Sequence, residues 1–111
     1  METFEQGKVV TVTAGTPVAL SAPPANRFQL VSAIMVAQVP GTTGNVYFGK
    51  KTMTKSTYVG VLRPFLPPGA SGFIDDIVIG DMDGPNVLDP TQYGVDSDTN
   101  GMGLVVTYFQ T

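Results

Sequence analysis

Glycine and proline interrupt this chain so often that they leave little room for a long helix. Its 111 residues include 13 glycines and 9 prolines, and no window combines a 3.6-residue apolar period with a helix cap. Valine and threonine are frequent between these breaks, and both favour strands. The sequence therefore predicts an all-β protein in which short strands are separated by turns.

We expect about seven or eight antiparallel strands. Alternation predicts a first strand at Lys8–Thr13, which returns after a turn as Val18–Leu20 to form a hairpin. Phe28–Val39 is apolar on both faces and is expected to be the longest strand and a central one. The polar tract Lys50–Thr57 is expected to be a surface loop. Further strands are expected at Asn45–Gly49, Phe73–Gly80, Tyr93–Val95 and Leu104–Gln110.

The length and the spacing of these strands indicate one domain. We expect residues 9–111 to form a single-domain β-sandwich or a jelly-roll-like barrel. Residues 1–8 are expected to be an N-terminal arm, which in an extended conformation would reach the sheet edge of a neighbouring subunit. Low charge and a two-sided apolar strand also favour a homo-oligomer.

Composition excludes several classes of function. The chain has no histidine and no cysteine, which removes His-dependent triads, disulfides and Cys-ligated metal sites. Charged residues make up 14% of the chain and the net charge is −3, so we expect no nucleic-acid binding. The chain contains no run of 18 apolar residues, so we expect no membrane span. The first residues lack the pattern of a signal peptide. We expect no enzymatic activity and no cofactor.

The segment "DSDTNG" resembles the first half of a calcium loop. Asp96, Asp98 and Asn100 fill the first three ligand positions and Gly101 the invariant glycine position. The bidentate glutamate that should follow is Thr107, which cannot chelate in that way. Asn-Gly is also a favoured corner between strands. The sequence favours a plain turn, and a weak calcium site at Asp96, Asp98 and Asn100 is the alternative.

Other reactive or binding groups are weaker still. Asp75 and Asp76 are adjacent in a predicted strand and would face opposite sides, so they are not expected to act as paired carboxylates. Most aromatic residues follow strand patterns, which favours core packing over a sugar-binding platform. Arginine often anchors interfaces. Our interface candidates are Phe4, Arg27, Lys50, Lys51, Arg63 and Phe65.

The order of features from Phe28 onward resembles small structural proteins of tailed bacteriophages, of the head-decoration or minor-virion type. "FQLVSAIMV" is followed by the strand Asn45–Gly49, "NVYFG", and by a Thr-rich loop. The turn Leu66–Ser71, "LPPGAS", leads to the segment Asp89–Tyr93 and then to an acidic Gly turn and a closing Val-rich strand at 96–109. The double proline and the insertion Gly80–Val87 depart from the pattern.

This resemblance implies a non-enzymatic function. Proteins of that type bind the outside of the capsid, often as trimers, and stabilise contacts between major capsid subunits. For this chain the resemblance implies a decoration or cement protein on the capsid exterior, with the major capsid protein as partner and a homotrimer as the favoured assembly. The alternatives are a phage tail, collar or fibre-base protein, and a β-sandwich module that binds sugars or host surfaces.

Overall fold

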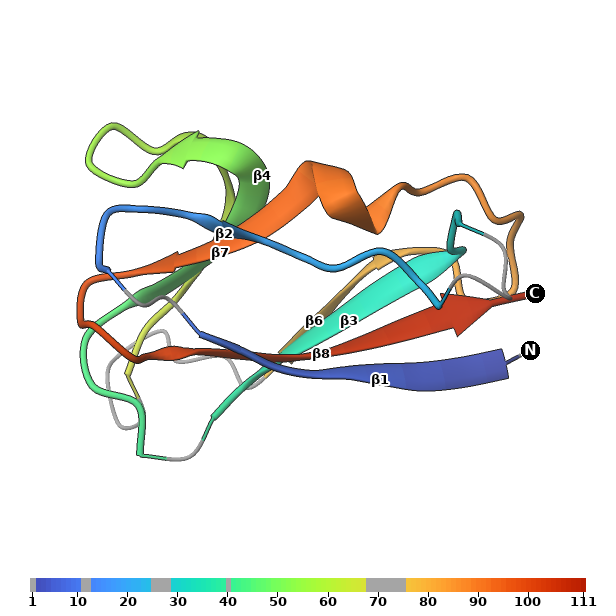
Figure 1. Ribbon diagram of the computed structural model, residues 1–111, viewed down its shortest axis with the longest axis horizontal. Coiled ribbons are helices and arrows are strands. Elements are labelled where there is room, and N and C mark those ends of the chain that lie inside the picture. The colour runs from blue at the N-terminus through green and yellow to red at the C-terminus, as the bar shows by residue number, and fades with distance from the viewer. Residues whose placement is uncertain (1, 11–12, 25–28, 40, 68–75) are drawn as a thin grey trace.

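The computed structural model describes residues 2–10, 13–24, 29–39, 41–67 and 76–111, which form two packed four-stranded antiparallel sheets (Figure 1). The elements are β1 (Glu2–Val10), β2 (Val18–Ala19), β3 (Ala33–Gln38), β4 (Val46–Thr54), β5 (Val59–Phe65), β6 (Asp76–Gly80), the 3₁₀ turn η1 (Pro90–Gln92), β7 (Tyr93–Ser97) and β8 (Gly103–Gln110). The strand orders are β1-β8-β3-β6 and β2-β7-β4-β5. The predicted all-β sandwich is confirmed. The barrel alternative is wrong, because the two sheets do not close on each other.

The core lies between the sheets and is built by strand alternation. In β8, Leu104, Val106 and Tyr108 point inward, as their shared face predicts. Ile34 and Val36 of β3 pack beside them from the same sheet. The opposite sheet and the connecting segments contribute Leu20, Val31, Val46, Phe48, Phe65 and Val95. The aromatic side chains of Phe48 and Tyr108 are fully buried, which confirms the core interpretation for these two residues. Phe65, an interface candidate, is fully buried as well.

The predicted N-terminal hairpin is wrong. β1 pairs with β8, from Glu2 opposite Gln110 to Val10 opposite Gly103. β2 instead joins the other sheet and pairs with β7. The connection between β1 and β2 therefore crosses from one sheet to the other. Residues 1–8 were expected to be an arm. The described part of this segment, residues 2–8, belongs to β1 and pairs with β8 of the same chain.

Two further boundaries differ from the prediction. β3 has six residues instead of the expected twelve at 28–39, although its central position between β8 and β6 is confirmed. The polar tract at 50–57 is largely strand, because β4 continues to Thr54, which pairs with Val59 of β5. Its lysines and threonines within β4 tolerate a strand because their side chains are exposed to solvent. The strand β5 itself was not predicted.

Candidate binding surfaces

The β4–β5 hairpin bends over the outer face of its own sheet (Figure 1). The pairing of β4 with β5 is irregular between Gly49 and Thr54. At this bend the backbone of Gly49 lies against β5: a Cβ on Gly49 would be 2.3 Å from the carbonyl oxygen of Gly60. Tyr58 at the turn has a φ of 59°, the only positive φ found at a non-glycine residue of the described chain. The hairpin therefore depends on two unusual backbone features, the close approach at Gly49 and the positive φ at Tyr58.

The hairpin is fastened to the outer face of the sheet by Lys55. Its ammonium nitrogen lies 2.8 Å from Oδ1 of Asp98, and the Tyr47 hydroxyl donates to Asp98 at 3.2 Å. Tyr58 packs edge-on against the Tyr47 ring, with centroids 6.1 Å apart. Burial alone would raise the pKa of the Asp98 carboxyl. The hydrogen bonds from Lys55 and Tyr47 and the charge of Lys55 outweigh burial, so the pKa of Asp98 is lowered. The hydrogen bond to Asp98 in turn raises the pKa of Lys55.

Asp96 is fully buried beneath the connection between β1 and β2. Its Oδ1 atom accepts from the backbone amides of Gly15 at 2.9 Å and of Ser97 at 2.8 Å. Its Oδ2 atom is buried and has no hydrogen-bond partner among the described residues. Asp96 therefore holds the crossing connection against the sheet.

The structure does not bring the three calcium candidates together as a ligand set. Asp96 binds backbone amides, Asp98 binds Lys55, and Oδ1 of Asn100 accepts from the amide of Ala14 at 2.8 Å. Within the described ranges, no three acidic side chains are grouped to hold a metal ion. Gly101, with a φ of 82°, lies in a tight turn closed by the Met102 amide and the Thr99 carbonyl. This turn connects β7 of one sheet to β8 of the other.

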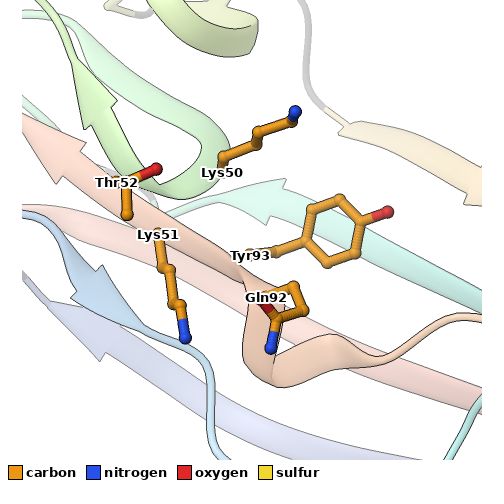
Figure 2. A pocket seen from close by; sticks show the side chains of 5 residues that line it. All are labelled: Lys50, Lys51, Thr52, Gln92 and Tyr93. Carbon is orange, nitrogen blue, oxygen red and sulfur yellow. The ribbon is translucent and has the colours of Figure 1, made fainter.

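A shallow groove of about 260 Å³ lies where β4 meets η1. Figure 2 shows that Lys50 and Lys51 extend away from each other, while the Tyr93 ring lies nearer Lys50. Thr52 and Gln92 complete the lining. The Tyr93 ring stacks on Phe48, with centroids 5.8 Å and planes 9° apart. The groove is polar at its rim and has one aromatic wall.

The interface candidates have different environments. Lys50 and Lys51 are exposed on β4. Phe65 is fully buried in the core, so the single chain offers none of its surface to a partner. Arg63 is partly buried, and its Nε atom has no hydrogen-bond partner in the described part of the chain. Arg27 and the side chain of Phe4 lie outside the described residues.

Exposed apolar side chains are the feature that the sequence analysis missed. Three lie on the β4–β5 hairpin, which also carries two exposed lysines, and we call Lys50, Lys51, Tyr58, Val59 and Leu62 the hairpin patch. The others are Val78 on β6 and three residues in or near the segment after β6, namely Leu30, Met82 and Val87. Together with the exposed Asp81 and Asp83 of that segment, we call these three residues the loop patch. The run "TYVGVL" after a polar tract was an available signal for an exposed apolar edge.

The segment that carries the loop patch is well ordered by hydrogen bonds. The side chain of Asn86 donates to the Thr111 carbonyl at 2.9 Å and accepts from the Thr111 amide at 3.0 Å. Val31 and Leu88 exchange two backbone bonds of 2.8 and 2.9 Å. The Asp83 amide donates to Oδ1 of Asp81 at 3.0 Å. The exposed side chains of this segment are therefore presented in a defined arrangement.

Comparison of the chain with protein families, with curated proteins and with solved structures produced no match. In the part of the chain that the structure describes, no helix has the length and hydropathy needed to span a membrane.

Proposed function

We propose that this chain is a non-enzymatic virion structural protein that binds the outer surface of a bacteriophage capsid and stabilises contacts between major capsid subunits. The order of sequence features that resembles head-decoration proteins supports this proposal. One observation of the structure carries it further: two apolar patches are exposed at separate places on a small, well-packed sandwich. A protein with two such surfaces suits the joining of neighbours in an assembly.

The stabilising effect would arise from many weak contacts. Burial of apolar surface contributes about 25 cal/mol for each Å² removed from water. One copy therefore gains little, but many copies bound across a lattice add their contributions. We propose that the chain acts as a homo-oligomer, with a trimer favoured, on the capsid exterior.

The groove supports a second candidate function, a module that binds sugars or host surfaces. The Tyr93 ring offers an aromatic wall, and Gln92 and Thr52 offer hydrogen-bonding groups beside it. A glycan array tests this function. Saturable binding that Tyr93→Ala abolishes would support the sugar-binding candidate against the capsid candidate.

Co-sedimentation with capsids tests the proposed function. Purified protein is added to expanded heads of the phage that encodes it, and the heads are pelleted. We expect saturable binding with a fixed ratio of this chain to major capsid protein, and a higher temperature of head disruption. Heads that pellet with no bound protein, or that disrupt at an unchanged temperature, would contradict the proposal.

A further inference from the structure

Exposed charges of opposite sign separate onto the two apolar patches. The hairpin patch carries Lys50 and Lys51, whose side chains leave β4 in different directions (Figure 2). No described residue forms a salt bridge with either of them. The loop patch carries the exposed carboxylates of Asp81 and Asp83. The hairpin and the segment after β6 lie toward opposite ends of the 35 Å long axis (Figure 1). One chain therefore presents two surfaces that match in polarity and have opposite charge.

Both patches mix charged and strongly exposed apolar side chains. Val59 and Val87 are 65% and 64% exposed, the highest fractions among the large apolar residues described. A Cβ at Gly60, next to Val59 in the chain, would be 3.6 Å from Cβ of Lys50, so this part of β5 lies against the Lys50 position of β4. On the loop patch, Met82 lies between the two aspartates in the chain. Contact between such surfaces buries apolar area while opposite charges fix its orientation.

We propose that the hairpin patch of one copy binds the loop patch of a second copy, so that copies associate head to tail. The two patches are different surfaces at different ends, which makes the contact heterologous and leaves each pair with one free patch of each kind. A closed ring uses all of them. The contact rests on the homo-oligomer of the proposed function, and it names the two surfaces that meet in it.

Charge reversal tests this contact in solution, without capsids. Multi-angle light scattering is expected to give wild type a mass that is a multiple of 11.7 kDa and that falls at about 0.5 M salt, where screening is strong. We expect Lys50→Glu with Lys51→Glu to give the monomer mass. Asp81→Asn with Asp83→Lys is expected to do the same, and the amide side chain introduced at position 81 retains the oxygen that accepts from the backbone amide of residue 83.

A fourfold variant that combines all four substitutions in one chain tests whether association can be restored. The hairpin then carries two negative charges and the loop one positive charge, so association is expected to return. Asp76→Lys, which changes an exposed carboxylate on β6 outside both patches, is the matched control and should leave the mass unchanged. Val59→Ser and Val87→Ser test the apolar part of the contact without altering charge, and each should lower the mass.

Several results would overturn the head-to-tail contact. The first is a wild-type mass of 11.7 kDa at a concentration of about 100 µM, which is about a hundredfold above a Kd of 1 µM. The second is a charge variant that keeps the wild-type mass while folded, and the third is a fourfold variant that stays monomeric. Melting curves confirm the fold of each variant. Because no capsid is present, these results are separate from the co-sedimentation test: a monomer that still saturates heads would contradict only the head-to-tail contact.

Discussion

At the scale of single residues, two tyrosines offer a matched measure of burial. The Tyr108 side chain is fully buried and its hydroxyl donates to the Ser21 carbonyl at 2.5 Å. Tyr58 is 56% exposed. We expect Tyr108→Phe to lower the free energy of unfolding by about 1 kcal/mol, the usual net value of one hydrogen bond. Tyr58→Phe should change it by less than about 0.5 kcal/mol. Urea denaturation measures both, and equal effects would contradict the assignment.

Burial, with a smaller contribution from Asp89, also raises the pKa of Tyr108. A raised folded-state pKa favours the neutral phenol, so this contribution is complete below the unfolded pKa of about 10 and is lost as pH rises above it. Wild type should therefore lose stability above about pH 10 more steeply than Tyr108→Phe does. Identical alkaline profiles would show that the phenol is not shielded.

The Asp98 carboxylate predicts a dependence of the opposite sign. Its pKa is lowered because Lys55 and Tyr47 outweigh the effect of burial. Its stabilisation is therefore present above the unfolded pKa of about 3.9 and is lost as pH falls through the folded value. The Asp98 side chain is 38% exposed, so we expect Asp98→Asn to cost under about 1 kcal/mol at pH 7. Denaturation between about pH 7 and 3 should show a shallower acid loss in the variant, and parallel curves would contradict this.

The same residues predict the response to calcium. A metal ion between Asp96 and Asp98 would have to displace Lys55 from Asp98. We expect the melting temperature to stay unchanged when calcium is added to about 5 mM, well above the affinity range of even weak extracellular sites. Removal of calcium with a chelator should also leave the melting temperature unchanged. A saturable rise in melting temperature that Asp98→Asn abolishes would instead establish the calcium site.

At the scale of elements, the pairing of β1 with β8 depends on one glycine. A Cβ on Gly103 would be 1.8 Å from the carbonyl oxygen of Val9 and 2.7 Å from Cα of Val10. Gly103→Ala must therefore push β1 away and should cost at least about 3 kcal/mol, at the upper end of overpacking effects. Gly101→Ala meets no atom within 4 Å and should cost only about 1–2 kcal/mol for its positive φ. Chemical denaturation ranks the two, and the reverse order would contradict this pairing.

Elements also show what the sequence could predict. The face of β8 formed by Leu104, Val106 and Tyr108 was predictable, because alternation determines which side chains of a strand are buried. The pairing of β1 was not, since strand order depends on contacts between residues far apart in the chain, such as Glu2 with Gln110. The polar residues at 50–54 hid a strand because most of their side chains are exposed, and an exposed stretch lacks the apolar pattern that reveals a buried strand.

The candidate surfaces were predictable only in part. Lys50 and Lys51 were found because they are adjacent cations in a weakly charged chain. Phe65 was misjudged because sequence position does not show whether an aromatic residue near a proline-rich turn faces the core. The exposure of Val59 and Val87 depends on the bend of the hairpin and on the hydrogen bonds around Asn86, which no local pattern reveals.

At the scale of the whole molecule, the sandwich exposes apolar side chains in two separate patches, which is the feature that the proposed surface lattice requires. The core on which the structure rests draws side chains from both sheets, so the exposed patches are not required for folding. Substitutions in the patches should therefore change assembly while leaving the melting temperature within a few degrees of wild type.

Electron microscopy of purified virions tests the central claim most directly. We expect density of the size of this sandwich at regular positions on the capsid exterior, in contact with more than one major capsid subunit and absent from virions that lack the gene. Density confined to the tail or collar, or complete virions that contain none of this chain, would contradict the capsid function.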